Sequence, residues 1–473
     1  REPRTLGLPP GRLMALSAQG EIAMLLSGGA EGTLARVPLA GGVPRAVIED
    51  VSAADWSPDG SKLAVIRSIN GRNRVEYPPG TVLYETTGRP PYLLRVSPKG
   101  DLAAFFDYDP AVGDFAVAVA GPGVPKRNLC TGWRGVTGIA WAPSGDEVWF
   151  TAAHVAADPW IWSVSLKGKI RQRAQVPGWL ALRDIDRNGR ILVQTINSRT
   201  AIAFRGARDS REKDLSWLDT SYVFDISRDA KQVLFVELSY GEGRNQAIYV
   251  RGTDGTPAVL LGFGNRPSLS PDGKQVAALH DEAGKSQVVV FSTGAGEPKT
   301  LATPGMKYDS VEWMPDGRRV FFAGSEAGRP PRSFVWDVES GQVSPMTPEG
   351  ARATLVRPDG KVAVAVDGNR YMAVGLGGGE ARPIGTVEPG ERLVRWAADG
   401  ASLFLRRPAS GGRVLELVRM DAATGAKRVW KTLSLVDDTG VTVAIATVTP
   451  DGESYAFSYQ RDLANLYLLE GVK

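Results

Sequence analysis

The chain has 473 residues, of which 43% are hydrophobic and 23% charged, so it is expected to be folded throughout. Its 56 basic residues nearly balance its 52 acidic residues, giving a formal net charge of +4. Nucleic acid is therefore a poor candidate partner, because binding it requires a concentrated basic surface. Cys130 is the only cysteine, which excludes an intramolecular disulfide and a cysteine-based zinc site and leaves the redox compartment open.

A turn motif recurs eleven times along the chain. Its clearest form is "WSPDGSKLAV", residues 56–65, with a large apolar residue, a Ser-Pro-Asp-Gly turn and a short apolar run. Proline presets φ at the second turn position, aspartate bonds the backbone ahead of it, and glycine adopts a positive φ. The turns end at Gly20, Gly60, Gly100, Gly145, Gly189, Ala230, Gly273, Gly317, Gly360, Gly400 and Gly452.

The spacing of these turns indicates a β-propeller. Successive turns lie 40 to 45 residues apart, except for a last interval of 52. This period is the length of one four-stranded propeller blade. The residue four positions before each turn end is apolar in all eleven repeats, as expected of a side chain that packs between blades. Many repeats carry a second glycine-rich turn, so each blade is predicted as four strands joined by hairpins.

The two ends of the chain are predicted to meet in one blade. The chain begins with "EPRTLGLP", residues 2–9, and nearly the same phrase, "EPKTLATP", ends a complete repeat at residues 297–304. The last repeat offers strands over "SYAFSYQ" and "LANLYLLEG" and then stops at Lys473. The N-terminal strand is therefore expected to complete this last blade, because closure removes two open sheet edges.

Eleven blades exceed the four to eight that single rings commonly have. The sequence therefore favours two fused propellers, a first lobe over residues 1–220 and a second over residues 221–473, closed by the N-terminal strand. One large ring is the alternative, because the repeats are evenly spaced and no linker interrupts them.

Few residues indicate chemistry. The two histidines, His154 and His280, lie in no metal-ligating cluster. The sequence contains no nucleophile elbow, no phosphate-binding glycine loop and no kinase catalytic loop. We therefore expect no catalytic residue, no metal site and no cofactor in this chain.

Candidate binding residues occupy one position of the repeat, five residues before the turn end. If the first strand of each blade lines a channel, a charged residue here could face a ligand or an ion. The alternative is that these residues pair with charges on the adjacent blade. Six repeats have a charge at this position: Asp55, Arg95, Asp184, Asp225, Glu312 and Arg395.

The "WSPDGSKLAV" repeats resemble those of TolB-like propellers. A closer resemblance is to the propeller at the C-terminal end of bacterial eukaryotic-like serine/threonine protein kinases. It is carried by "GTLARVPLAGGVPRAVIEDVSAADWSPDGSKLAV", "EYPPGTVLYETTG", "EKDLSWLDTS", "RLVRWAADGASLFLRR" and "DLANLYLLEGVK", and it spans the chain from Arg4 to Lys473.

This resemblance implies a parent protein with an N-terminal kinase domain, a membrane-spanning helix and an outward-facing propeller. Arg1 would then follow the membrane anchor. No apolar stretch of the chain approaches the roughly 20 residues that cross a bilayer. The chain would lie outside the cytoplasm, in the periplasm or at the cell surface.

Three hypotheses on function follow. In the first, the chain is a non-catalytic sensor that binds a ligand or protein partner through its loops or channel mouth. In the second, it is a TolB-like envelope module that binds a protein partner, although this sequence lacks the expected separate N-terminal domain. In the third, it is a hydrolase or lyase, which requires at least two of the channel carboxylates, Asp55, Asp184, Asp225 and Glu312, to converge with perturbed pKa values.

Overall fold

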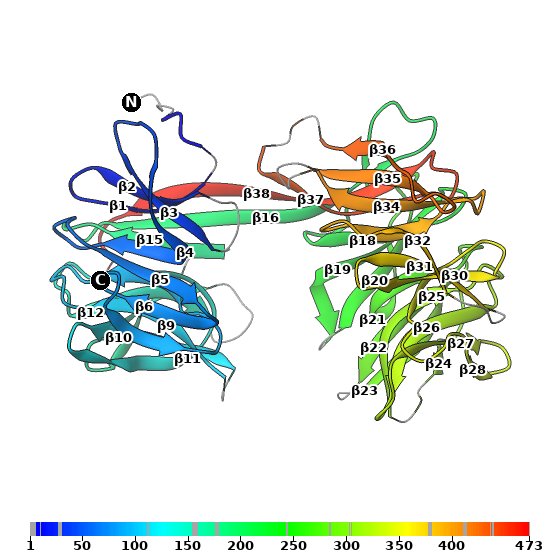
Figure 1. Ribbon diagram of the computed structural model, residues 1–473, viewed down its shortest axis with the longest axis horizontal. Helices are drawn as coiled ribbons and strands as arrows, with labels where there is room; N and C mark the ends of the chain where they lie inside the picture. The colour runs from blue at the N-terminus through cyan, green and yellow to red at the C-terminus, as the bar shows by residue number, and fades with distance from the viewer. Residues whose placement is uncertain are drawn as a thin grey trace. The chain divides into compact units, whose positions relative to one another are not determined.

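The structure is a computed structural model that describes residues 6–9, 11–26, 31–110, 113–153, 159–175, 179–242, 245–282, 285–301, 303, 305–376, 381–409, 414–435, 437 and 439–472. The regular secondary structure of these residues consists of β-strands alone. Figure 1 shows the strands, which belong to two compact units. Unit 1 comprises residues 1–197 and 464–473, and unit 2 comprises residues 198–463.

Most strands lie within one unit, whereas the long strands β16 and β38 pass from one unit into the other. The strands that begin in unit 1 are β1 (Arg12–Leu16), β2 (Glu21–Leu25), β3 (Gly32–Pro38), β4 (Arg45–Trp56), β5 (Leu63–Ile69), β6 (Arg72–Glu76), β7 (Val82–Thr86), β8 (Tyr92–Val96), β9 (Ala103–Asp109), β10 (Asp114–Gly121), β11 (Val124–Trp141), β12 (Glu147–Ala153), β13 (Trp160–Ser165), β14 (Ile170–Ala174), β15 (Trp179–Ile185) and β16 (Ile191–Arg205). The strands that begin in unit 2 are β17 (Lys213–Asp214), β18 (Ser221–Ile226), β19 (Gln232–Glu242), β20 (Asn245–Gly252), β21 (Val259–Leu269), β22 (Gln275–Glu282), β23 (Lys285–Ser292), β24 (Lys299–Leu301), β25 (Met306–Trp313), β26 (Arg319–Glu326), β27 (Arg332–Asp337), β28 (Val343–Pro345), β29 (Ala353–Val356), β30 (Val362–Asp367), β31 (Arg370–Gly375), β32 (Arg382–Thr386), β33 (Arg392–Trp396), β34 (Ser402–Pro408), β35 (Leu415–Asp421), β36 (Lys427–Leu433), β37 (Val441–Val448) and β38 (Tyr455–Leu469).

The strands group into four-stranded antiparallel blades. The sheets β25–β28, β29–β32 and β33–β36 are one blade each. The seven-stranded sheets β1–β7, β8–β14 and β18–β24 each hold two blades, because a long strand serves both. In β4, Arg45 pairs with Arg36 of β3, whereas Trp56 pairs with Leu63 of β5. The predicted all-β propeller fold is confirmed.

The Ser-Pro-Asp-Gly turns join the first two strands of a blade, as their chemistry requires. In the turn that ends at Gly273, the amide N–H of Gly273 donates to the carbonyl of Ser270 at 2.9 Å. The hydroxyl of Ser270 donates to Asp272 Oδ1 at 2.7 Å and accepts the amide of Gln275 at 2.9 Å. Gly273 has a φ of 74°, which a residue without Cβ adopts at little cost.

Apolar residues follow one another along a central strand such as β26, so both faces of a blade are buried against neighbouring blades. In β26, Phe321 packs with Ala353 on one face, and Phe322 packs with Trp313 and Trp336 on the other. Both phenylalanines are almost completely buried. Successive side chains of a strand point to opposite faces, so one strand fills two layers of the core.

The inner strands of unit 2, one from each blade, form a closed ring. They contact one another in the order β18, β21, β25, β29, β33 and β37, and β37 returns to β18. A closed ring of six inner strands does not fit the alternative of one ring of eleven blades. In unit 1 the inner strands β1, β4, β8, β11 and β15 contact one another in that order.

The last repeat differs from its predicted strands. The sequence predicts separate strands over "SYAFSYQ" and "LANLYLLEG", but residues 455–469 form one strand, β38. Only Arg461 and Asp462 separate the two phrases, with no glycine or proline between them, and the chain continues as one strand. The sheet that contains β38 has the order β15-β16-β38-β37, with β17 beside β16.

Two expectations stay predictions: the role of the N-terminal strand and the boundary between the two lobes. The strand expected over residues 2–9 lies partly outside the described residues. Its described leucines, Leu6 and Leu8, pack against a cluster that includes Ile22 and Val37. The sequence-based lobes, 1–220 and 221–473, also stay a prediction, and the two units described above are used below.

Ser458 of β38 is expected to be important for closing the ring of unit 2. Its buried hydroxyl accepts the amide N–H of Val223 on β18 at 2.7 Å. Ser458→Ala would leave this buried N–H without a partner and lower the free energy of unfolding by about 1–3 kcal/mol.

The matched control is Ser340→Ala, on an exposed turn of the same unit, which should change stability by less than about 0.5 kcal/mol. Chemical denaturation followed by tryptophan fluorescence measures both variants. Equal midpoints for the two variants would contradict the importance of Ser458.

Candidate functional site: the channel of unit 2

A cavity of about 670 Å³ lies inside the ring of inner strands in unit 2. Its lining includes the same repeat position, five residues before the turn end, from all six blades. These six residues are Asp225, Ser268, Glu312, Leu355, Arg395 and Thr447. The cavity is therefore the axial channel of this propeller, and three of the six sequence candidates face it.

One end of the channel is bordered by the turns between the first two strands. The second turn position of every blade contributes to the lining. In four blades this residue is proline and in one it is Ala398, but in the blade that begins with β18 it is Arg228. A cationic side chain thus stands at one point of an otherwise apolar rim.

Asp225 connects three parts of the ring. Its Oδ2 accepts the amide N–H of Leu269, on the inner strand of the next blade, at 3.1 Å. Its Oδ1 accepts the amide of Ile226 at 2.8 Å. The guanidinium of Arg395, from β33, forms an ion pair with Oδ1. Because β37 stands between β33 and β18 in the ring, this ion pair joins two blades that are not neighbours.

Glu312 is the second carboxyl group of the channel. Its Oε2 accepts the hydroxyl of Ser268 at 2.6 Å. Desolvation raises the pKa of Glu312 to about 7, the Ser268 hydrogen bond opposes this rise, the negative charge of Asp225 adds to it, and Arg395 opposes it. A carboxyl group with such a pKa exchanges its proton near neutral pH.

Three further arginines line the channel, Arg228, Arg266 and Arg406. Burial and repulsion by Arg395 lower the pKa of Arg228, although Asp225 acts in the opposite direction. Burial and repulsion by Arg392 likewise lower the pKa of Arg406. Within the part of the chain that the structure describes, none of the three forms an ion pair with a carboxylate.

A second cavity, of about 1040 Å³, adjoins the channel. The two cavities share the residues Phe224 and Arg266 in their linings. The second one also presents two lysines, Lys285 and Lys307, and two aspartates, Asp281 and Asp309. Asp309 is paired with Arg352 at 3.3 Å. Arg266 therefore stands where the two cavities meet.

The other three sequence candidates belong to unit 1. Asp55 Oδ2 accepts the amide of Val96, on the next inner strand, at 2.8 Å, as Asp225 does in unit 2. Burial raises the pKa of Asp55, Arg95 lowers it, and Asp184 adds a smaller rise. The guanidinium of Arg95 donates to the carbonyls of Leu94 and Arg183. Asp184 is exposed, and its Oδ1 accepts the amide of Ile185.

The four carboxylates of the enzyme hypothesis are thus divided two and two between the units. Only Asp225 and Glu312 line a common cavity. Asp225 is ion-paired with Arg395, whereas Glu312 accepts a hydroxyl and has a raised pKa.

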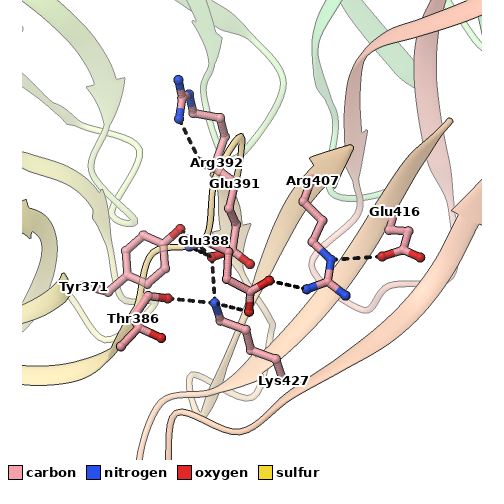
Figure 2. Close-up of polar contacts among 8 residues, drawn as sticks. All are labelled: Tyr371, Thr386, Glu388, Glu391, Arg392, Arg407, Glu416 and Lys427. Atoms are coloured by element: carbon pink, nitrogen blue, oxygen red, sulfur yellow. Dashed lines mark hydrogen bonds and ion pairs between the residues drawn. The ribbon is translucent and has the colours of Figure 1, made fainter. Parts of the chain in front are cut away.

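A second polar cluster in unit 2 joins the two blades β29–β32 and β33–β36, as Figure 2 shows. The ammonium of Lys427, on β36, donates to the carbonyl of Thr386 at 2.7 Å and to Glu391 Oε2 at 2.7 Å. The hydroxyl of Tyr371 also donates to Glu391 Oε2, at 3.2 Å. Glu391 is almost completely buried, so its charge is held by these donors. We interpret this cluster as a connection between blades.

Glu388 extends this network to β34 and β35, the second and third strands of the blade β33–β36. Its Oε2 accepts Arg407 Nη1 at 2.6 Å, and Arg407 Nε donates to Glu416 Oε2 at 2.9 Å (Figure 2). Every charged group named here therefore has a charged partner within the network, unlike Arg228, Arg266 and Arg406 of the channel.

The remaining reactive side chains offer no competing site. His280 Nδ1 lies 2.8 Å from the carbonyl of Phe263, and His154 lies outside the described residues. Burial raises the pKa of Cys130 to about 11, and Trp133 Nε1 donates to its sulfur, so the thiol is unreactive at neutral pH. Among the described residues, no three His, Cys, Asp or Glu side chains gather as a metal site would require. Nor does this part of the chain hold a helix long and apolar enough to cross a membrane.

Sequence reasoning missed Arg228, Arg266 and Arg406. Arg228 had a signal, since it replaces the proline of the turn motif. Arg266 and Arg406 lie on β21 and β34, outside the repeat position five residues before the turn end. Their place at the channel depends on how adjacent strands are curved and paired, which one sequence does not reveal.

No family model matches the chain. A segment of 104 residues, 20% of this chain, is 28% identical to a protein of Aspergillus clavatus named dipeptidyl-peptidase 5, and it spans only 14% of the length of that relative. Similar solved structures include a TolB of Agrobacterium tumefaciens, with 18% identity, 56% of this chain and 99% of that chain covered, and a TM-score of 0.41.

Two further solved structures are similar to this chain at comparably low sequence identity. One is TolB from Acinetobacter baumannii, with 14% identity, 62% of this chain and 83% of that chain covered, and a TM-score of 0.38. The other is an oligogalacturonate lyase in complex with manganese, with 14% identity, coverage of 59% and 77%, and a TM-score of 0.36. The fold described above therefore rests on the strands of this chain.

The raised pKa of Glu312 predicts a pH-dependent stability. The folded-state pKa, about 7, lies above the ordinary 4.5 of glutamate, so the folded protein binds the extra proton between these values. The free energy of unfolding should therefore fall as pH rises from about 5 to 8, by about 2 kcal/mol after allowance for solvent in the cavity.

Glu312→Gln removes the titrating group and keeps a partner for Ser268, so this fall should disappear in the variant. Glu453→Gln, on an exposed turn of the same unit, is the control and should keep the wild-type profile. Denaturant melts at several pH values measure the three proteins. Identical profiles for both variants would show that Glu312 does not cause the pH dependence.

Proposed function

We propose that this chain is the ligand-binding propeller of a membrane-anchored serine/threonine kinase, and that the channel of unit 2 is its ligand site. The observation that carries the binding site is the charged channel, with Asp225, Glu312, Arg395 and three arginines around a cavity of about 670 Å³. Ligand sites of proteins commonly have volumes of about 300–1,000 Å³ and a few convergent polar groups. In this proposal the chain is a sensor and not the catalyst.

The kinase context rests on the resemblance of the repeats to kinase-associated propellers. It makes the parent membrane-anchored and places this chain outside the cytoplasm, in the periplasm or at the cell surface. The two compact units would be its two propeller lobes, with residues 198–220 in the second lobe instead of the first.

An enzyme is the second candidate, because one observation favours it. Asp225 and Glu312 line the same cavity, and their environments differ: Arg395 holds the charge of Asp225, whereas desolvation raises the pKa of Glu312 to about 7. A protonated and an ionised carboxyl group in one site is the arrangement that many hydrolases use for acid and base catalysis. A TolB-like module that binds a protein partner would use the same channel mouth without turnover.

The gene sequence that precedes the codon for Arg1 tests the kinase context. We expect it to encode a serine/threonine kinase domain followed by one membrane-spanning helix. A signal peptide joined to a small soluble domain would favour the TolB-like module instead, and would remove the kinase from the proposal.

A thermal-shift screen of the chain tests ligand binding. The ligands are divalent ions, cell-wall fragments, sugars, organic acids and short peptides. A ligand that binds only the folded state at 100 times its Kd adds about 2.7 kcal/mol of stability, which raises Tm by several degrees. Recovery of the ligand unchanged after long incubation supports a sensor, and conversion to a product supports the enzyme. No shift with any ligand would contradict a small-molecule site in the channel.

A further inference from the structure

We propose that the channel of unit 2 holds a small organic anion with two or more acidic groups, bound by Arg228, Arg266 and Arg406. This inference rests on the proposed function, because it names the class of ligand for the same channel. Two observations carry it. The channel wall holds more arginines than carboxylates, and three of these arginines form no ion pair within the described part of the protein.

The channel has an excess of positive charge. Four arginines line it, against the carboxyl groups of Asp225, Glu312 and Asp451. Asp451 is used by its own turn, where it accepts the hydroxyl of Thr449 and the amide of Glu453. Only Asp225 neutralises an arginine of the channel, through its ion pair with Arg395.

The other three arginines form no ion pair with a carboxylate among the described residues, although the charge of Asp225 acts on Arg228. Arg406 donates to the carbonyl of Ala444 at 3.4 Å, and no hydrogen bond or ion pair is formed by Arg228 or Arg266 within this part of the protein. Several arginines elsewhere in unit 2 do have a carboxylate partner. Examples are the pairs of Arg407 with Glu416 and of Arg419 with Asp399.

Arg228 and Arg266 are exposed to solvent where they line the channel, and Arg406 is partly buried, so all three guanidinium groups can reach a ligand and none is held by an ion-paired carboxylate. Desolvation and repulsion by a neighbouring arginine lower the pKa values of Arg228 and Arg406, so positive charges stand close together in the channel. A bound anion would remove the repulsion and give each arginine a partner. Guanidinium groups bind carboxylates and phosphates alike through paired N–H donors.

The size and position of the site define the ligand further. A cavity of about 670 Å³ accepts a small molecule and not a folded partner. Arg228 borders the channel at the turns, and Arg266 stands where the second cavity begins. Arginines at separate places around one cavity favour a ligand with acidic groups at more than one position.

The ionised Glu312 would repel such a ligand, whereas its neutral form can donate a hydrogen bond to it. The charged groups that face Glu312 are Asp225 from β18 and Arg395 from β33, with Ser268 from β21 as its hydrogen-bond donor. The site therefore combines arginines with one carboxyl group that is able to lose its charge near neutral pH.

Titration calorimetry of the full chain with citrate and with pyrophosphate, at constant ionic strength, tests the proposal. Saturable binding of at least one of these anions is expected, and which one binds tells whether the acidic groups are carboxylates or phosphates. The double variant Arg228→Gln/Arg266→Gln should weaken binding at least tenfold, since each charged hydrogen bond contributes more than the 1.4 kcal/mol that corresponds to a factor of ten.

The control is Arg370→Gln, an exposed arginine on β31 outside both cavities, which should bind as the wild type does. Arg406→Gln is a second test should the double variant fold poorly, as judged by circular dichroism. Unchanged affinity in the channel variants would overturn the proposal, because the anion would then bind elsewhere.

Two outcomes separate this inference from the proposed function. If neither anion binds but a neutral ligand from the thermal-shift screen binds and survives the arginine substitutions, the anion class is wrong and the ligand-binding propeller stands. If neither the anions nor any ligand of the screen binds, both proposals fail.

Discussion

The ring of unit 2 depends on the carboxylate of Asp225, which connects three of its inner strands. It accepts backbone amides from its own strand and from the next inner strand, and it pairs with an arginine two blades away. The hydrogen bonds hold neighbouring inner strands in register, and the ion pair sets the charge of the channel. A single side chain thus links the geometry of the ring to the chemistry of the space inside it.

The same residue type at the same repeat position has a comparable role in unit 1. Asp55 accepts the amide of Val96 in the next blade, as Asp225 accepts that of Leu269. The sequence alternative, pairing with a charge on the adjacent blade, describes neither residue, since both accept a backbone amide there and Asp225 pairs with an arginine of a blade that is not adjacent. Asp225 forms the bond between blades and also lines the channel.

Much of the fold could be predicted because each repeat carries its own turn chemistry. A Ser-Pro-Asp-Gly turn forms through local hydrogen bonds, such as those of Ser270 and Asp272, so its spacing gives the blades directly. The pairing of β16 with β38 could not be predicted in this way, because these two strands come from segments about 260 residues apart. One such contact joins Gln460 to Ser198.

The candidate site was predictable only in part, because two neighbouring positions of each inner strand obey different constraints. The residue four positions before the turn end packs between blades, and Trp313 and Trp396 are buried there. The residue five positions before it is Glu312 or Arg395 in the same blades, and these side chains line the channel beside the two tryptophans. The position four residues before the turn end must be apolar for the blades to pack, so its regular recurrence allows the fold to be predicted from a single sequence.

The position five residues before the turn end need not be apolar, because polar side chains there can bond neighbouring strands, as Asp225 does. In unit 2 it holds aspartate, serine, glutamate, leucine, arginine and threonine in the six blades. Its identity can change from blade to blade while the blades stay intact, so the channel is free to acquire any chemistry that its ligand requires. A propeller of this kind therefore reveals its architecture through what repeats, and its specificity through the residues, such as Arg228 in place of a turn proline, that break the repeat.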